Sequence, residues 1–172
     1  MKVVLFCGGL GTRLKEYSET IPKPMAEIGP RPIMWHLMKY YAHFGHNEFI
    51  LCLGYRGDYI RDYFLHYNEC LSNDFTLSDG GRTIQLYNRD IADWKIGQRL
   101  VAARKYLGDD PVFMANYTDG LSDLNLHQYV EFFNRQNKVA SFLSVRPSAT
   151  FHTVASNCDG TVTHIDDVRN TD

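Results

Sequence analysis

Apolar and polar positions along this chain follow two patterns. Short continuous apolar runs at residues 2–6, 48–53 and 111–115 predict strands that are covered on both faces. Apolar side chains at helical spacing predict helices over residues 32–43, 58–67, 98–106 and 125–136. Three further strands are expected over residues 139–145, 151–156 and 161–166.

A polar segment punctuated by glycine lies between two of the predicted helices. Phe75-Thr76-Leu77 and Thr83-Ile84-Gln85-Leu86-Tyr87 flank Asp79-Gly80-Gly81, which predicts a hairpin. Elsewhere strands and helices alternate, which favours an α/β fold with a doubly wound, mostly parallel (mixed) sheet. Ligands of such sheets bind at the carboxyl ends of the strands.

Composition excludes several classes of protein. The chain has 172 residues, long enough for one domain with a sizeable core, and 18 Lys and Arg against 20 Asp and Glu give a net charge of −2. Neither a nucleic-acid-binding arm nor a basic membrane-binding patch is expected. The cysteines show no C-x-x-C spacing and there is no signal peptide or membrane span, so we expect reduced thiols and a cytoplasmic protein.

A glycine-rich loop directly follows the first predicted strand. Gly8-Gly9-Leu10-Gly11-Thr12-Arg13-Leu14 offers bare backbone N–H groups and one cation, which suits a phosphate ester of a nucleotide. The loop lacks the Gly-Lys-Ser/Thr of a P-loop, and Leu14 stands where a dinucleotide-binding loop has its third glycine. A plain turn between strand and helix is the alternative.

Two prolines flank the lysine of Pro22-Lys23-Pro24, ten positions after Arg13. They hold this lysine on a stiff, extended segment, which a solvated loop lysine would not need. By contrast, the aromatic residues Tyr40, Tyr41 and Phe44 are interpreted as core and subunit contacts.

The glycine loop and the Pro-Lys-Pro segment, with Glu27-Ile28-Gly29 and Arg31-Pro32-Ile33, resemble the signature of the sugar-1-phosphate nucleotidylyltransferases. The resemblance covers nearly the whole chain. It extends through Leu53-Gly54-Tyr55-Arg56-Gly57, Gly97-x-Arg99-Leu100 and Asp119-Gly120, which are similar to the branch of the family that joins CTP to glucose 1-phosphate.

The resemblance implies a Rossmann-like nucleotide-diphospho-sugar transferase architecture, with residues 1–172 in a single nucleotidyltransferase domain. It further implies an Mg²⁺-dependent enzyme of O-antigen or other carbohydrate biosynthesis that converts CTP and glucose 1-phosphate to CDP-glucose and pyrophosphate, as a homo-oligomer. The same chemistry with dTTP or UTP stays open, as does a non-catalytic regulatory subunit that binds nucleotide sugars.

The resemblance also implies roles for individual residues. Arg13 is expected to grip the leaving pyrophosphate and Lys23 to contact the α-phosphate, which makes them the two catalytic candidates. Asp119 is expected to hold Mg²⁺, with a plain Asp-Gly turn or a helix cap as the alternative. The expected nucleotide-binding residues are Phe6, Cys7, Gly8, Gly9, Leu10, Gly11, Thr12, Arg13, Lys23 and Arg99.

The chain departs from the family pattern in four places. Cys7 stands where the family usually has Ala, and Thr118 where it has Gly. A strand and loop that the family carries between the segments matching Asp93–Ile96 and Gly97–Leu100 are absent, and the chain ends before the family's sugar-binding stretch and second metal aspartate. We therefore expect an internal gap near residues 96/97 and a missing C-terminal part.

Overall fold

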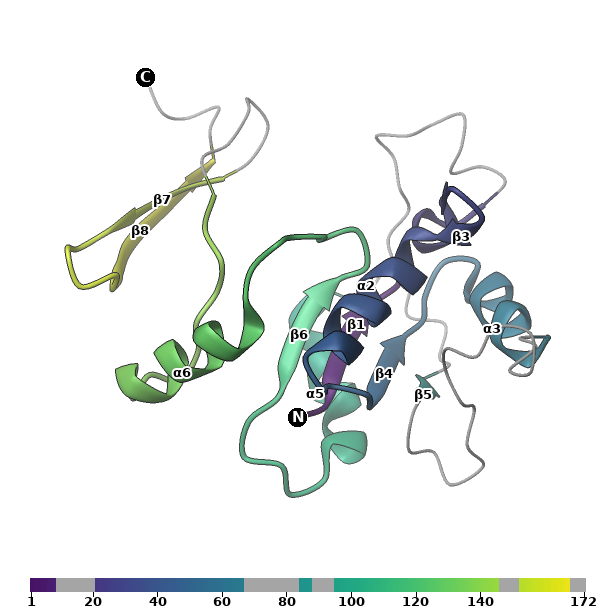
Figure 1. Ribbon diagram of the computed structural model, residues 1–172, viewed down its shortest axis with the longest axis horizontal. Helices are drawn as coiled ribbons and strands as arrows, with labels where there is room; N and C mark the ends of the chain where they lie inside the picture. The colour runs from purple at the N-terminus through teal and green to yellow at the C-terminus, as the bar shows by residue number, and fades with distance from the viewer. Residues whose placement is uncertain (9–20, 67–83, 88–94, 146–151, 168–172) are drawn as a thin grey trace. The chain divides into compact units, whose positions relative to one another are not determined.

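The computed structural model describes residues 1–8, 21–66, 84–87, 95–145 and 152–167 (Figure 1). The contacts within the chain divide it into two compact units, Met1–His127 and Gln128–Asp172. The expectation of one domain over the whole chain stays a prediction.

The first unit is built on a four-stranded parallel sheet in the order β5-β4-β1-β6. These strands are β1 (Val3–Phe6), β4 (Phe49–Cys52), β5 (Ile84–Tyr87) and β6 (Met114–Tyr117). Val3 of β1 is in register with Phe49 on one side and Met114 on the other. The predicted parallel α/β fold is therefore confirmed, and the carboxyl ends of the strands share one edge.

Helices lie on both faces of this sheet (Figure 1). Alternate side chains of β1 and β4 pack against helix α5 (Ile96–Leu107), with Ala103 and Leu107 at the contact. On the opposite face lies α2 (Ile33–His43), whose Met34, Leu37 and Met38 are fully buried. Helix α3 (Gly57–Leu65) adds two further core side chains, Ile60 and Phe64. The sheet is thus covered on both faces, as its continuous apolar runs predict.

A small hairpin leads into α2. The 3-10 helix η1 (Lys23–Met25) precedes the antiparallel pair β2 (Glu27–Ile28) and β3 (Arg31–Pro32). Pro32 is the N-cap of α2, so the helix begins at Ile33, one position after the start that the sequence predicts. Its fixed φ of −66° suits the extended backbone at that position.

Helix α6 (Leu126–Gln136) leads into the second unit, where β7 (His152–Ser156) and β8 (Val162–Asp167) form an antiparallel hairpin. The prediction of a strand over residues 139–145 is wrong, since the structure has no strand there. That stretch pairs with none of the described strands, so an apolar sequence alone does not make it a strand.

Two other predictions need correction in detail. The strand expected over residues 111–115 lies at Met114–Tyr117, where pairing begins with Met114 N–H donating to the carbonyl of Lys2, directly before β1, at 3.0 Å. The second arm of the expected hairpin, as β5, pairs in parallel with β4, while its first arm lies outside the described residues. Among the described residues, no helix is long and apolar enough to cross a membrane.

Candidate functional site

The ends of β1, β4 and β6 form the edge at which a parallel sheet binds its ligands (Figure 1). Gly8 follows β1, Gly54 follows β4, and Asp119 follows β6. These residues are far apart in the sequence but adjacent here, because neighbouring parallel strands end at the same edge.

Lys23 and Asp119, two residues predicted to act on phosphate and metal, form an ion pair through Lys23 Nζ and Asp119 Oδ2. The lysine is the first residue of η1 and lies between Pro22 and the buried Pro24, which fix its backbone. Both charged side chains keep solvent access, at 42% and 33% exposure. The structure thus brings a cation and a carboxylate together at the edge of the sheet.

Asp119 lies in a tight turn closed by a hydrogen bond from Gly120 N–H to Tyr117 O at 3.2 Å. The side-chain amide of Asn116 donates to Gly120 O at 3.1 Å and to the hydroxyl of Tyr41 at 3.2 Å. A Cβ at Gly120 would come within 2.6 Å of Asn116 Oδ1. The Asp-Gly turn of the alternative interpretation therefore exists, and it presents its carboxylate to Lys23.

Gly8 and Gly54 let the ends of β1 and β4 approach each other. A Cβ at Gly8 would lie 2.7 Å from Nη1 of Arg99 and 2.8 Å from Cα of Gly54. A Cβ at Gly54 would lie 2.7 Å from Cα of Gly8. Gly8, predicted to let backbone approach a ligand, thus has a packing requirement within the protein itself.

Arg99 lies in the first turn of α5 and is only 5% exposed. Burial raises the pKa of the Cys7 thiol well above its usual value, with Cys52 adding to the rise and Arg99 opposing it. Burial likewise raises the pKa of Cys52 to about 11, again opposed by Arg99. Both thiols are therefore protonated at neutral pH and behave as apolar groups.

The side chains of Phe6 and Cys7 point into the protein rather than toward solvent. Phe6 packs its ring against Tyr117 at 6.1 Å between centroids, and Cys7 is 1% exposed with its thiol 3.9 Å from Met34 Sδ. Any contact of these two residues with a nucleotide would come from their backbone. Gly9, Leu10, Gly11, Thr12 and Arg13 lie outside the described residues.

Asp119 is a suitable donor for a hard cation, because Mg²⁺ prefers one or two carboxylates together with phosphate oxygens and water. Within the described part of the chain, no three His, Cys, Asp or Glu residues gather into a cluster. A single, partly exposed carboxylate beside a lysine fits a cation that is shared with a phosphorylated substrate, and does not fit an all-protein cage.

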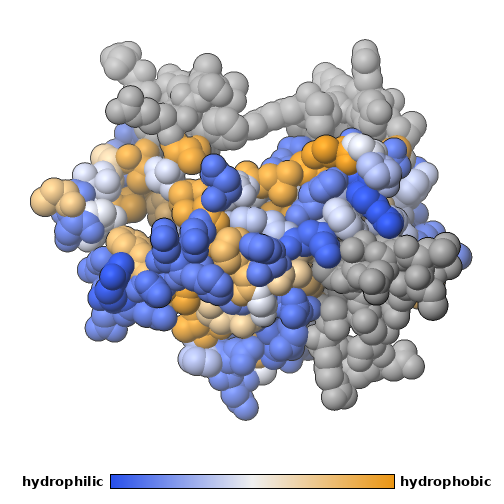
Figure 2. Space-filling model, in the orientation of Figure 1, coloured by the Kyte–Doolittle hydropathy of each residue, from blue (hydrophilic) through white to orange (hydrophobic). Residues whose placement is uncertain are grey.

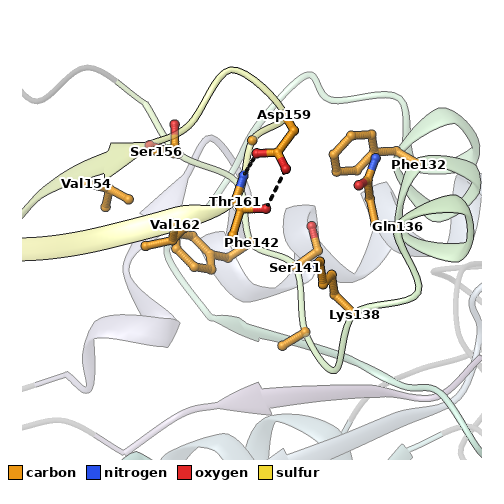
Figure 3. Close-up of a pocket in the computed structure, with 13 residues that line it drawn as sticks. Phe132, Gln136, Lys138, Ser141, Phe142, Val154, Ser156, Asp159, Thr161 and Val162 are labelled. Atoms are coloured by element: carbon orange, nitrogen blue, oxygen red, sulfur yellow. Dashed lines mark hydrogen bonds between the residues drawn. The ribbon is translucent and has the colours of Figure 1, made fainter.

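The second unit has a hollow of about 390 Å³ between the end of α6, residues 138–144 and the β7–β8 hairpin (Figure 3). Phe132 and Phe142 line it with polar side chains around them. Asp159 accepts hydrogen bonds from Thr161 N–H at 3.0 Å and from its hydroxyl at 3.1 Å, which lower the pKa of that carboxyl. The hollow contains none of the predicted site residues.

Sequence reasoning missed Asn116, Tyr41 and Gly54 as parts of this site. Asn116 carried a signal, since it is a polar residue within an otherwise apolar strand, three positions before Asp119. Tyr41 is 5% exposed, as a core aromatic should be, but its hydroxyl also reaches the Asn116 amide. That contact spans 75 positions, so no local pattern could show it.

Comparison with known proteins shows the family and the fold of this chain. The chain is 38% identical over 165 residues to a probable glucose-1-phosphate cytidylyltransferase of Bacillus subtilis, covering 90% of this chain and 64% of that protein. It is 35% identical over 162 residues to the glucose-1-phosphate cytidylyltransferase of Salmonella typhimurium, covering 88% of this chain and 63% of that protein. It therefore spans less than two thirds of these relatives.

A solved structure from Bacillus anthracis, described as a putative glucose-1-phosphate thymidylyltransferase, shares the fold with a TM-score of 0.73 at 21% identity, over 97% of this chain and 64% of that one. The model of the nucleotidyl transferase family matches residues 2–166, which include the glycine loop, Lys23, Asp119 and all of the parallel sheet. The chain belongs to the nucleotidyl transferase family.

Proposed function

We propose that the protein containing this chain transfers the cytidylyl group of CTP to glucose 1-phosphate, giving CDP-glucose and pyrophosphate. The observation that carries this proposal is the pairing of Lys23 with Asp119 beside the end of β1. Membership of the nucleotidyl transferase family gives this pair its interpretation as phosphate and cation ligands.

The reaction places modest demands on the side chains. An oxygen of the sugar phosphate attacks the α-phosphorus, a new P–O bond forms, and the bond to the bridging oxygen breaks as pyrophosphate leaves with the electron pair. No side-chain nucleophile is needed, so catalysis consists of positioning and neutralising charge. Lys23 would bind the α-phosphate, where its ammonium group offsets charge as the leaving group departs.

When substrates bind, the Lys23–Asp119 ion pair can separate, so that the lysine contacts phosphate and the carboxylate contacts a cation. Pairs of partly exposed charges contribute little stability, about 0–1 kcal/mol, so their separation costs little. Asp119 would then hold Mg²⁺, which when bound neutralises phosphate charge and orients the oxygens it contacts. Arg13 and the N–H groups of residues 8–14 are proposed to hold the β- and γ-phosphates.

The choice of CTP and glucose 1-phosphate is supported by the names of the Bacillus subtilis and Salmonella relatives. The same chemistry with dTTP or UTP is the first alternative, and a non-catalytic nucleotide-sugar-binding subunit is the second. A cytoplasmic homo-oligomer stays a prediction.

The test measures pyrophosphate release by the purified whole protein with glucose 1-phosphate, Mg²⁺ and each of CTP, UTP, dTTP and GTP. We expect kcat/KM to be at least about 10-fold higher for CTP than for the others, as a pocket that hydrogen-bonds one base achieves. Equal rates with dTTP or UTP would reject the cytidylyl assignment. Tight nucleotide binding without pyrophosphate release, by protein that is fully folded, would favour the regulatory subunit.

A further inference from the structure

Helix α2 connects the two charged residues of the candidate site. At its first residue, Ile33 N–H donates to Ala26 O at 2.8 Å, directly after the 3-10 helix that carries Lys23. Near its last turn, the hydroxyl of Tyr41 accepts a hydrogen bond from Asn116, on the strand that leads to Asp119. One rigid element therefore contacts both segments that form the ion pair.

The Asn116 amide is well placed to fix the acidic turn. Its Nδ2 group donates one hydrogen bond to Tyr41 and one to Gly120 O, so both of its N–H bonds are used. The hydroxyl of Tyr41 thus determines the orientation of the amide that holds Gly120. In the folded chain Tyr41 is 5% exposed, so its hydroxyl has little competition from water.

The neighbouring tyrosine makes a similar contact with a different segment. Tyr40 donates to Leu124 O at 2.5 Å, beyond the acidic turn, and its ring packs edge-on against Tyr41 at 5.4 Å between centroids. The hydroxyls of these adjacent residues therefore make hydrogen bonds to different places, Tyr41 to Asn116 within β6 and Tyr40 to Leu124 after it. Only the Tyr41 bond leads, through Asn116, to the residue next to Asp119.

We propose that Tyr41 and Asn116 are positioning residues, which hold the turn Tyr117–Gly120 so that the Asp119 carboxylate is presented to a divalent cation. This inference rests on the proposed function, because it assumes that Asp119 binds the cation. Replacing a residue whose hydrogen bonds orient a metal ligand commonly lowers the affinity for the metal by about 10-fold or more. The hydrogen bonds that link the buried Tyr41 hydroxyl through Asn116 to Gly120, next to Asp119, are support of this kind.

The experiment compares Tyr41→Phe with Tyr40→Phe in the whole protein. Each variant loses one hydroxyl and keeps its ring, so the two match in chemistry and in position along α2. Mn²⁺ is the probe, and its binding is measured by electron paramagnetic resonance without any turnover. We expect Tyr41→Phe to weaken Mn²⁺ binding about 10-fold, and Tyr40→Phe to leave it within about 2-fold of the wild type, while thermal unfolding shifts similarly in both.

A third variant tests the route through the amide. Asn116→Ala should weaken Mn²⁺ binding at least as much as Tyr41→Phe, and the double variant should be no weaker than Asn116→Ala alone, because the hydroxyl acts through the amide. Additive effects, or Tyr41→Phe with wild-type affinity, would overturn the inference while leaving the proposed function intact. If Asp119→Asn binds Mn²⁺ as well as the wild type, the assignment of the cation to Asp119 fails together with the inference.

Discussion

Lys23 and Asp119, which are proposed to bind phosphate and a cation, are both partly exposed, so the proposed roles can be tested separately from any contribution to folding. An ion pair with this much solvent access contributes about 0–1 kcal/mol to stability. In the proposed function a developing negative charge on phosphate would depend far more strongly on the same lysine, since removal of one such contact costs about 10²-fold or more in turnover.

We therefore expect Lys23→Ala to lower kcat for pyrophosphate release by about 10²-fold, with an unfolding temperature close to that of the wild type. Lys105→Ala is the matched control, because Lys105 is an exposed lysine of α5 and should keep wild-type turnover. Steady-state kinetics and thermal melts measure both effects. Normal turnover of folded Lys23→Ala would exclude the lysine from catalysis.

The buried thiols predict a loss of stability at high pH. The Cys52 thiol titrates at about 11 in the folded chain against a usual value of 9.0, and burial raises the pKa of Cys7 in the same direction. The folded state thus keeps protons that the unfolded state releases. The contribution of Cys52 is complete below about pH 9 and is lost as pH rises toward 11, at up to about 1.4 kcal/mol per pH unit, and the contribution of Cys7 is lost in the same direction.

Urea unfolding between pH 8 and pH 11 measures this slope. Cys52→Ala should reduce the slope, whatever its effect on stability at pH 8, because a buried thiol with a raised pKa is gone. Cys158→Ala, at an exposed cysteine, should leave the slope unchanged. An identical slope in wild type and Cys52→Ala would contradict the raised pKa.

At the scale of the elements, the close approach of β1 and β4 makes a second prediction about stability. Gly54→Ala places a Cβ 2.7 Å from Gly8 Cα, a contact with backbone that cannot rotate away. We expect the free energy of unfolding to fall by about 1–3 kcal/mol, as overpacked cores do.

Gly97→Ala provides the opposite control. No atom lies within 4 Å of a Cβ at this position, and Gly97 is within α5, so alanine should stabilise by about 0.5–1 kcal/mol. Urea denaturation of both variants tests the pair. If Gly54→Ala stabilised the protein, the ends of β1 and β4 would have to lie further apart than the 2.7 Å contact implies.

Elements with strong patterns were predictable to within one or two residues, while those that depend on distant partners were not. The runs at residues 2–6 and 48–53 became β1 and β4 because continuous apolar strands suit a sheet covered on both faces. The run at 139–145 is equally apolar, but none of the described strands pairs with it.

The junction at 96/97, where the sequence predicts an internal gap, lies in the first turn of α5. The start of this helix is marked by Lys95 N–H donating to Gln98 Oε1 at 2.9 Å.

The candidate site was predictable where a residue's own type and neighbours carried the signal. The two prolines around Lys23 and the position of Asp119 after a strand were visible in the sequence, and the structure pairs these residues. The roles of Tyr41 and Gly54 depend on what lies opposite them in the fold, which one sequence does not show. Arg13 stays a prediction, because it lies outside the described residues.

At the scale of the molecule, each unit exposes apolar side chains, and the face in Figure 2 shows apolar patches between polar ones. Val101 of the first unit is 75% exposed, while in the second Val139 is fully exposed and Val145 is 72% exposed. Phe142 and Leu143, about half exposed, lie in the same stretch as the two valines. Contiguous apolar surface favours association.

We expect the 172-residue chain to self-associate in a concentration-dependent way through residues 139–145. The double variant Val139→Lys/Val145→Lys should sediment as a smaller species than the wild type at the same concentration. Val101→Lys, which removes an exposed valine outside residues 139–145, should have a smaller effect. Sedimentation velocity measures all three, and equal distributions would locate the association elsewhere.

The parallel sheet also sets the order in which the site can arise during synthesis. Lys23 belongs to the segment after the first strand, and Asp119 follows the last strand of the same sheet. At about 5–20 residues per second, a ribosome needs about 5–20 s to make the intervening chain. A nascent chain therefore carries Lys23 for seconds before Asp119 exists, and it gains the complete lysine–carboxylate pair only when β6 has joined the sheet.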